Sequence, residues 1–467
     1  MIVSLPSAQG GAMDLKPLFE PKSLAVVGVS LHNDLHPSNI IFYKNLYRYP
    51  VEAYPVNPKA GVLKGVAAYS SVRDLPEVVD LAIISARAEA VPGILEDCVT
   101  TGVKAGAIIS GGFAEVGNND LQRQIVSIAR DADFPFIGPN CLGIYSPSHY
   151  DSFFFAPERM SVPQQGNVAI ISQSGGLLVD QMIGFSVEGV GLSLAVSIGN
   201  KAVIGETDLL DYLEQDEKTR VICLYIEGFA EDEGREFLLK AKKCKKPIVL
   251  LKAGKSPGGS KAVSSHTASL AGDYTVFSKV LSQNGIVEAR NPSELMHFCE
   301  SLSAYQTPIQ GNVSIITLSG GHGALATDLC FEYGLTVPPF SQLEQDLIRK
   351  RLRPSIASIA TCTNPVDLTG TSTDDDYVEA ARVIGAFDQI ECLMMLLLPY
   401  APGLSSDLGA RLSIVSKQAG KPMIAYLPRH EKYRMLIEGF EINGVPVAHT
   451  IEGAAQMALA MAKYRRF

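Results

Sequence analysis

One histidine stands in chemically unusual surroundings. His266 lies in SSHTASLAGDY (264–274), a run of small, hydroxylated and glycine residues, whereas a structural histidine usually has apolar neighbours and a metal ligand has partners at fixed spacings. An imidazole nitrogen can accept a phosphoryl group and act as a transient carrier, provided that a partner on the opposite nitrogen fixes the tautomer. Glu227, in LYIEGF, ends a neighbouring strand and could reach it. A hydrogen-bonded loop histidine beside a surface glutamate is the simpler alternative, and the residue types alone do not decide.

Two turns of nearly identical sequence could bind an anion. The stretches GNVAIISQSGG (166–176) and GNVSIITLSGG (311–321) agree at most positions, and each is typical of a buried strand that runs through a glycine turn into a helix. A helix start favours an anion through its free N–H groups and its dipole. Two such starts could point at one anion, or both could be tight turns inherited through duplication. The candidate phosphate-binding residues are Ser174, Gly175, Gly176, Gly320 and Gly321.

The similarity between these two regions continues along the chain in the same order. The further counterparts are 221–229 and 390–400, 245–254 and 420–429, and 284–295 and 443–454. We therefore expect one fold used twice, over about 163–305 and 310–467. The glycine- and serine-rich stretch around His266 occurs only in the first copy, and its composition predicts a flexible loop.

Both copies alternate short β-branched runs with longer helical patterns, which predicts an α/β fold with parallel sheets covered by helices on both faces. The first third does the same and has a Rossmann-like layout. Its five expected strands are LAVVGVS, AYPVNP, LAIISAR, AGAIISGG and FIGPN. At 467 residues, three domains are expected, over 13–150, 163–305 and 310–467.

The strand ends of the first third concentrate polar residues. Because ligands collect at the carboxyl ends of parallel strands, hydroxyls, Lys59 and Arg87 would gather on one edge and suit a large phosphorylated ligand. Gly28 taken alone is equally a tight strand–helix turn. No full GxGxxG motif and no hydride-transfer constellation is present, so a dinucleotide-dependent oxidoreductase is disfavoured.

The remaining composition narrows the class of protein. A formal net charge of -9 argues against a dedicated nucleic-acid binder. The eight cysteines are scattered singly, which indicates a reducing compartment rather than a disulfide framework. Neither a signal peptide nor an apolar run of about 18 residues is apparent, so a cytoplasmic protein without membrane contact is expected. His32, Asp34 and His36 have a spacing that could suggest a metal, but we interpret them as solvent-exposed polar residues and predict no metal in this chain.

These motifs resemble those of the nucleotide-diphosphate-forming acyl-CoA synthetases, relatives of succinyl-CoA synthetase, and in particular the alpha subunit of ADP-forming acetate–CoA ligases. The resemblance lies in SSHTASLAG, LYIEGF, GNKA with DLLDYL, IGPNCLGI, SQSGG and NPVDL, and it covers nearly the whole chain. It implies a Rossmann-like CoA-binding domain followed by two flavodoxin-like ligase domains. It also implies the reaction acyl-CoA + ADP + phosphate ⇌ carboxylic acid + CoA + ATP, through an acyl phosphate and a phosphohistidine at His266.

The resemblance also implies roles for individual residues. Glu227 would support the phosphohistidine, the two glycine turns would hold its phosphate, and Asn364 and Asp367 would lie near the acyl-phosphate site. The CoA-binding residues would be Gly28, Ser30, Lys59, Ser85, Arg87, Ser110, Gly111 and Asn140.

Three positions depart from the family pattern. Val203 stands where Asp often follows GNKA, His322 replaces the proline of a Gly-Gly-Pro-Gly turn, and LHNDLHPSN replaces a glycine-containing loop after VGVS. No segment is left over for an ATP-grasp module, so we expect a separate beta chain that holds Mg-ADP or Mg-ATP, in an α2β2 assembly, and a moving His266 loop. The alternative is a CoA- or acyl-CoA-sensing protein without turnover, although nothing about folding requires both His266 and Glu227.

Overall fold

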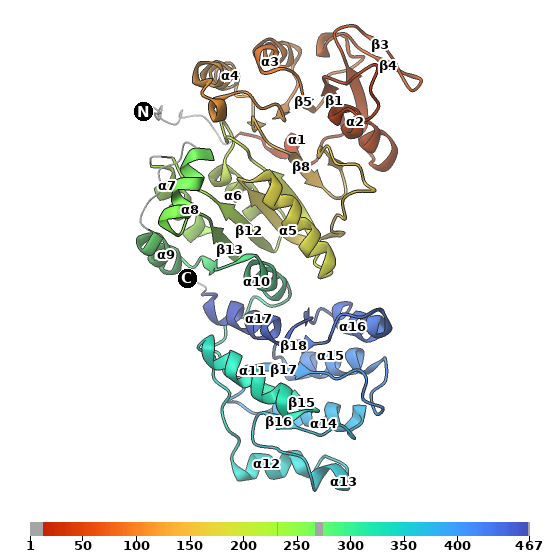
Figure 1. The fold of residues 1–467 in the computed structure, drawn as a ribbon, viewed down its shortest axis with the longest axis vertical. Coiled ribbons are helices and arrows are strands. Elements are labelled where there is room, and N and C mark those ends of the chain that lie inside the picture. The colour runs from red at the N-terminus through yellow and green to blue at the C-terminus, as the bar shows by residue number, and fades with distance from the viewer. Residues whose placement is uncertain (1–12, 231, 267–273, 466–467) are drawn as a thin grey trace. The chain divides into compact units, whose positions relative to one another are not determined.

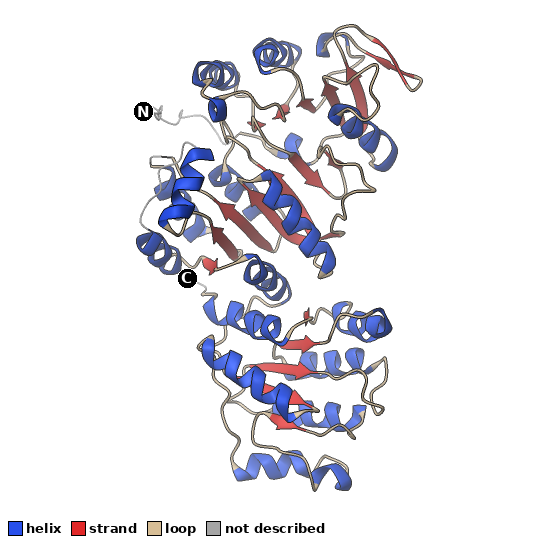
Figure 2. Ribbon diagram, in the orientation of Figure 1, coloured by secondary structure: helices blue, strands red, loops and turns tan. Residues whose placement is uncertain are grey.

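The computed structural model describes residues 13–230, 232–266 and 274–465, and the chain divides into two compact units, 1–288 and 289–467 (Figure 1). The first unit contains two large sheets and a short hairpin of β3 (Gly61–Leu63) and β4 (Val66–Ala68). The second unit contains one five-stranded sheet. Helices flank the sheets in both units (Figure 2).

The first sheet is entirely parallel. Its order is β2 (Glu52–Val56), β1 (Ser23–Val27), β5 (Leu81–Ile84), β6 (Ala105–Ile108) and β7 (Phe136–Ile137). Its helices are α1 (Lys16–Phe19), α2 (Pro37–Arg48), α3 (Val91–Thr101) and α4 (Asn119–Asp131). Alternate residues of β1 belong to two different apolar clusters, Leu24 and Val26 to one and Ala25 and Val27 to the other. The sheet is therefore buried on both faces, which explains why its strands are continuous apolar runs.

The second sheet of the first unit has seven strands. Its order is β14 (Val287–Ala289), β13 (Ile248–Lys252), β12 (Val221–Ile226), β10 (Gln165–Ser172), β11 (Leu192–Ser197), β8 (Gly143–Ser146) and β9 (Tyr150–Asp151). Strands β10 to β13 pair in parallel, and β8 and β9 extend the edge in antiparallel pairing. The helices are α5 (Gly175–Val187), α6 (Glu206–Gln215), α7 (Glu233–Lys243), α8 (Pro257–His266) and α9 (Tyr274–Gln283).

The second unit contains a single parallel sheet. Its order is β16 (Val366–Asp367), β15 (Val313–Thr317), β17 (Cys392–Leu396), β18 (Met423–Tyr426) and β19 (Val447–Ala448). The helices are α10 (Pro292–Ala304), α11 (Gly320–Glu332), α12 (Gln342–Arg349), α13 (Pro354–Ala357), α14 (Asp374–Gly385), α15 (Leu408–Ala419), α16 (Arg434–Glu441) and α17 (Ile451–Lys463). Helix α10 packs on α17, where the Ser301 hydroxyl donates to the Met457 carbonyl at 2.8 Å.

The predicted fold class is confirmed. In each of the three sheets, the five core strands follow the order 2-1-3-4-5 counted along the chain, which is the flavodoxin-like order of a doubly wound sheet. The strand order reverses between β1 and β5, between β10 and β12, and between β15 and β17. Ligands of such sheets bind at the carboxyl ends of the strands at this switch point. The residues that follow these six strands are therefore the candidates for ligand binding.

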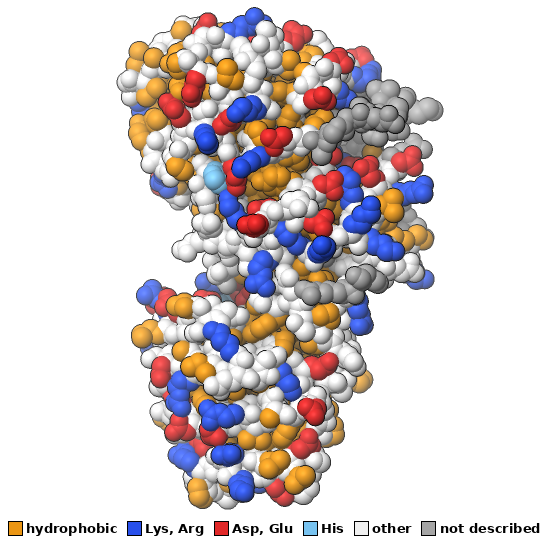
Figure 3. All heavy atoms as spheres, turned by 180° about the vertical axis from the view of Figure 1, so that it is seen from behind, with side chains coloured by type: hydrophobic (Ala, Val, Ile, Leu, Met, Phe, Trp, Pro, Cys, Tyr) orange, Lys and Arg blue, Asp and Glu red, His pale blue; other side chains and the backbone are white. Residues whose placement is uncertain are grey.

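The surface and the cysteines agree with a well-packed α/β protein. All eight cysteines are free thiols, and seven are buried, including Cys223 in β12 and Cys392 in β17. On the face drawn in Figure 3, basic and acidic side chains are interspersed. Among the described residues, no helix combines the length and the apolar character needed to cross a membrane.

Candidate functional site

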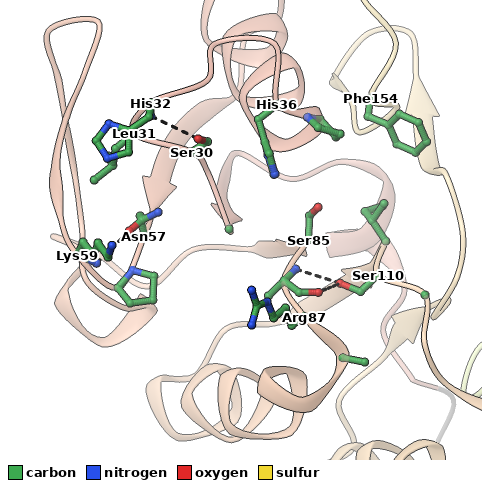
Figure 4. A pocket seen from close by; sticks show the side chains of 17 residues that line it. Ser30, Leu31, His32, His36, Asn57, Lys59, Ser85, Arg87, Ser110 and Phe154 are labelled. Carbon is green, nitrogen blue, oxygen red and sulfur yellow. Dashed lines mark hydrogen bonds between the residues drawn. The ribbon is translucent and has the colours of Figure 1, made fainter. Parts of the chain in front are cut away.

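A hollow opens at the carboxyl edge of the first sheet, at its switch point. It has a volume of about 910 Å³ and is lined by the segments that follow β1, β2, β5 and β6, together with the start of α2 (Figure 4). Gly28, directly after β1, has φ +102°, and a Cβ there would lie 2.1 Å from the Ser85 carbonyl oxygen. Only glycine allows the two strand ends to approach this closely, so Gly28 is required by the fold itself.

Most of the residues that the sequence analysis assigned to CoA lie around this hollow. The seven that line it are Gly28, Ser30, Lys59, Ser85, Arg87, Ser110 and Gly111. Asn140 does not line it. The Asn140 amide N–H donates to the Ser110 carbonyl at 2.8 Å, and its side chain lies 3.4 Å from the Asn200 side-chain oxygen, so Asn140 supports the loop behind the hollow.

The loop after β1 differs from the sequence expectation. His32 is solvent-exposed as expected, but His36 is half-buried, and both histidines line the hollow. Asp34 is exposed and interacts instead with the Tyr43 hydroxyl at 3.2 Å and with the Lys64 ammonium at 3.4 Å. Sequence reasoning missed the two histidines because it weighed their spacing for a metal rather than their place after a strand. The described part of the chain contains no group of three or more His, Cys, Asp or Glu that could hold a metal ion.

The first glycine turn follows β10 at the second switch point. Ser172 braces the turn, because its hydroxyl donates to the Ser174 carbonyl at 2.7 Å and accepts the Ser174 N–H at 3.1 Å. Ser174 is the N-cap of α5 and accepts the Leu177 N–H at 3.4 Å. A Cβ at Gly175 would lie 2.9 Å from Leu142, whereas a Cβ at Gly176 would meet no atom of the described chain within 4 Å. Packing thus explains Gly175 but leaves the space at Gly176 open to a ligand.

Glu227 directly follows β12, as predicted, and is buried. Gln173, in the glycine turn, holds this strand end in place. Its side-chain oxygen accepts the N–H groups of Glu227 at 2.6 Å and of Gly228 at 3.0 Å, and its amide nitrogen donates to the Gly228 carbonyl at 2.9 Å. The Lys252 ammonium donates to the Glu227 carbonyl at 2.6 Å. One glutamine therefore connects the two strand ends that flank the switch point.

A buried ion network lies beside Gln173 and was not anticipated. Gln173 also donates to the Glu206 carboxylate at 3.1 Å, and the Lys201 ammonium contacts Glu206 at 2.8 Å and Glu233 at 2.6 Å. Burial raises the pKa of the Glu206 carboxyl; Lys201 opposes this shift and Glu233 adds to it. Buried carboxyls with a raised pKa beside a glycine turn are found at functional sites as well as in structural ion pairs.

The segment before His266 is helical rather than a loop. Ser256 accepts the Gly259 N–H on its hydroxyl at 3.1 Å and the Ser260 N–H on its carbonyl at 2.8 Å, and Pro257 is favourable at the first helical position. These local signals produce α8, which ends at His266. Helix α8 follows β13, which pairs in parallel with β12, as expected of a neighbouring strand. The side chain of His266, and whether it contacts Glu227, lie outside what the structure describes.

The second glycine turn, after β15, repeats the brace of the first but not its cap. The Thr317 hydroxyl accepts the Ser319 N–H at 3.2 Å, as Ser172 does for Ser174. The Ser319 hydroxyl is 3.1 Å from Nδ1 of His322 rather than capping α11. A Cβ at Gly320 would lie 3.3 Å from Oδ2 of Asp367, and one at Gly321 would meet only the Ser319 hydroxyl, at 3.9 Å.

The NPVDL segment contributes two residues with different tasks. The Asn364 amide donates to the carbonyls of Val313 and Pro338 at 3.2 and 2.9 Å and accepts the Ile315 N–H at 3.0 Å. Asn364 therefore holds the backbone together around β15. Asp367 lies at the end of β16, where one carboxylate oxygen accepts the Thr369 N–H at 2.9 Å and the other faces Gly320. Of the two, Asp367 is the one directed at the helix start.

Comparison with protein families identifies two regions of the chain. Residues 22–147 match the model of a CoA binding domain, and residues 165–302 match that of a succinyl-CoA ligase like flavodoxin domain. The first match contains all the residues that line the hollow of the first sheet except Phe154. The second contains the first glycine turn, Gln173, Glu227 and His266.

Individual relatives match most of the chain. It is 36% identical over 409 residues to acetate–CoA ligase [ADP-forming] I of Archaeoglobus fulgidus, with 87% of this chain and 58% of that protein covered. It is 35% identical over 470 residues to acetate–CoA ligase [ADP-forming] I subunit alpha of Pyrococcus furiosus, with 97% and 98% covered. The chain thus spans little more than half of the first relative but almost all of the second.

A solved structure is similar over the same extent. The dinucleotide forming acetyl-coenzyme A synthetase 1 of Ca. Korarchaeum cryptofilum, in complex with phosphate and ADP, superposes with a TM-score of 0.86 at 31% sequence identity, with 97% of each chain covered.

Proposed function

The chain belongs to the family of ADP-forming acetate–CoA ligase alpha subunits, and from this premise we propose that it catalyses acyl-CoA + ADP + phosphate ⇌ carboxylic acid + CoA + ATP together with a second chain. The observation that supports this proposal most strongly is that the chain matches 98% of the length of the Pyrococcus furiosus alpha subunit. The retained His266 and the buried Glu227 favour an enzyme over a CoA sensor.

The reaction would proceed in three transfers, as in the resemblance. A phosphate oxygen attacks the thioester carbonyl carbon, the C–S bond breaks, and CoA leaves as the thiol after protonation. A ring nitrogen of His266 then attacks the phosphorus of the acyl phosphate, and the carboxylate leaves. Finally the phosphoryl group passes from nitrogen to the terminal oxygen of ADP, which restores the imidazole and yields ATP. The carboxylate of Glu227 would orient the ring and stabilise the charge on it.

CoA would bind in the hollow of the first sheet. The proposed contacts are Gly28, Ser30, Lys59, Ser85, Arg87, Ser110 and Gly111, which line it, with Asn140 as a supporting residue behind Ser110. The lining includes two cationic side chains and hydroxyls, a set that suits a phosphorylated ligand.

Phosphate would bind at the glycine turns. In the first unit we propose Ser174, Gly175 and Gly176, because the open position at Gly176 lets a ligand approach the helix start. In the second unit we propose Gly320 and Gly321, with Asp367 facing the reacting group and Asn364 positioning the strand behind it.

A partner is part of this proposal. We propose three domains, 13–150, 163–305 and 310–467, and a separate ATP-grasp beta subunit that binds Mg-ADP or Mg-ATP in an α2β2 enzyme. The match over 98% of a relative named as a subunit alpha supports a partner chain.

The test is a reconstituted reaction. The chain is mixed with an ATP-grasp beta subunit of an acetate–CoA ligase, acetyl-CoA, Mg-ADP and phosphate, and release of CoA thiol and ATP is measured. Stoichiometric release is expected, and His266→Ala should abolish it while CoA binding is retained. CoA binding by the wild-type chain without turnover over several acyl-CoAs would contradict the enzyme and favour the sensor.

A further inference from the structure

The loop after β1 uses its own backbone donors. Ser30 and Asn39 lock it together, because Oδ1 of Asn39 accepts the Ser30 N–H at 2.7 Å and Nδ2 of Asn39 donates to the Ser30 carbonyl at 2.8 Å. The Ser30 hydroxyl in turn accepts the N–H groups of His32 at 3.3 Å and Asn33 at 3.1 Å. Each of these three N–H groups therefore donates to the oxygen of a short polar side chain.

The N–H groups just before α2 are also hydrogen-bonded within the chain. The Leu35 N–H donates to the Asn33 side chain at 3.1 Å, and the His36 N–H donates to the Asn33 carbonyl at 3.0 Å. Pro37, at the first helical position, has no N–H group. An anion at a helix start is ordinarily held by free backbone amides. Five amides of this loop are already hydrogen-bonded within the chain, so an anion beside this loop would depend largely on side chains.

The hollow offers those side chains. His36 extends from the start of α2 into the hollow toward Ser85, with Lys59 and Arg87 on other walls and His32 on the same side of the hollow as Lys59 (Figure 4). Nδ1 of His36 is buried and has no hydrogen-bond partner among the described residues. No aspartate or glutamate is among the lining residues of the described chain, so nothing acidic in the wall competes with a bound anion.

We propose that His36, assisted by His32, binds a phosphate group of CoA through the imidazole ring, in place of the backbone amides that this loop has used internally. The inference rests on the proposed function, because it takes CoA as the occupant of the hollow. It assigns a positive role to the histidines by which LHNDLHPSN departs from the family pattern. His36 is the principal contact because Nδ1 of its half-buried ring has no hydrogen-bond partner among the described residues, whereas His32 is exposed at the rim.

The test is calorimetric titration of the full chain with CoA and with pantetheine, which lacks the phosphates. His36→Ala should weaken CoA binding roughly 10- to 100-fold, the loss expected for a charge-assisted hydrogen bond, and His32→Ala should weaken it less. Neither should change the weaker binding of pantetheine. The matched control is His149→Ala, which removes a histidine that contacts Glu20 and Lys218 in the same unit and should leave CoA affinity unchanged.

The outcomes separate the inference from the proposed function. Unchanged CoA affinity in His36→Ala would overturn the inference while leaving the function intact, and no CoA binding by the wild-type chain would overturn the function itself. If His36→Ala does not fold, His36→Gln keeps a neutral N–H donor at similar length and should bind CoA with an intermediate affinity. Wild-type affinity in a folded His36→Gln together with His32→Ala would also contradict the proposal.

Discussion

The two flavodoxin-like copies share a turn and differ at the strand end beside it. In both copies a hydroxyl two residues before the N-cap braces the turn, Ser172 in the first and Thr317 in the second. Both turns continue into a helix of thirteen residues, α5 and α11. The geometry that suits an anion is therefore common to both copies.

The sheet registers show where the copies diverge. Ser172 pairs with Tyr225, and Thr317 pairs with Leu396, so Glu227 in the first copy corresponds to Leu398 in the second. In the turn itself, Gln173 corresponds to Leu318. Leu318 and Leu398 are buried hydrophobic residues. The second copy thus fills with leucine the two positions at which the first copy has a glutamine and a buried glutamate.

This difference indicates which copy performs the chemistry. Leucine at both positions is compatible with the same fold, so Gln173 and Glu227 are not needed for folding. Burying a carboxylate costs free energy that its partners must offset, and Glu206, whose pKa burial raises, is a second buried carboxylate beside Gln173. Residues that oppose stability in this way concentrate at functional sites. We therefore propose that the phosphohistidine chemistry belongs to the first copy, and that the second copy contributes an anion-binding turn and Asp367.

The largest effect is expected from replacing the glutamate after β12 by leucine, the residue that the second copy has at the corresponding position. Glu227→Leu should lower the rate of the reconstituted reaction about 100-fold or more, because the imidazole loses the carboxylate that orients it. Steady-state rates and CoA affinity are measured together, and CoA affinity should not change. Glu236→Leu, which removes an exposed carboxylate from α7, serves as the matched control and should retain the wild-type rate; an equal loss there would remove the distinction.

A smaller effect is expected from Gln173→Leu, which copies Leu318 into the first turn. The Glu227 and Gly228 amides lose their acceptor, so the rate should fall about tenfold and the free energy of unfolding by about 1–3 kcal/mol. The control is Gln165→Leu, at the exposed start of β10, the strand that leads into this turn. If Gln173 acts through Glu227, Gln173→Leu should have little further effect on the rate in a Glu227→Leu background. Fully additive losses would mean that Gln173 has only a structural role.

The smallest effect concerns two capping aspartates at the third helical position, Asp208 of α6 and Asp376 of α14. Burial raises the pKa of Asp208. At Asp376 burial acts the same way and is the largest single influence, but the hydrogen bonds from Arg353 and Thr373 and the charge of Arg353 together outweigh it, and the pKa is lowered. The charge of Asp376 thus stabilises the folded state above the unfolded pKa of about 4, and this stabilisation is lost as the pH falls through the lower folded pKa. Asp208 instead loses stability as the pH rises from about 4 through its raised folded pKa.

Substitution by asparagine should therefore act in opposite directions in the two copies. Near neutral pH, Asp376→Asn should destabilise α14 by about 1 kcal/mol, and the difference should vanish at acid pH. Asp208→Asn should be neutral at acid pH and protect α6 slightly near neutrality. Hydrogen exchange of peptides from the two helices, compared with wild type at each pH, measures both effects. The same sign for both variants would show that the two caps are equivalent.

The sequence predicted the parts of the site that follow from strand and turn patterns. The five strands of the first third, both strand–turn–helix units and the position of Glu227 directly after β12 are confirmed, because apolar runs and glycine turns are local signals. The expected loop before His266 was wrong, because Ser256 and Pro257 start a helix that composition alone does not reveal.

Other parts of the site depend on contacts between distant segments. Only folding brings together the ion network of Lys201, Glu206 and Glu233. No spacing in the sequence predicts that Gln173 binds the backbone after β12. In the same way, His36 enters the hollow because α2 starts beside the ends of β1 and β5. Pairings of this kind are set by topology rather than by local pattern.

The most direct test of the account asks which copy carries the phosphoryl group. The chain is incubated with acetyl-CoA and isotopically labelled phosphate, digested under alkaline conditions that preserve phosphohistidine, and mapped by mass spectrometry. The account predicts label on His266 alone, and its loss in His266→Ala. Label on His322, the histidine at the second copy's turn, or undiminished label in His266→Ala would contradict it.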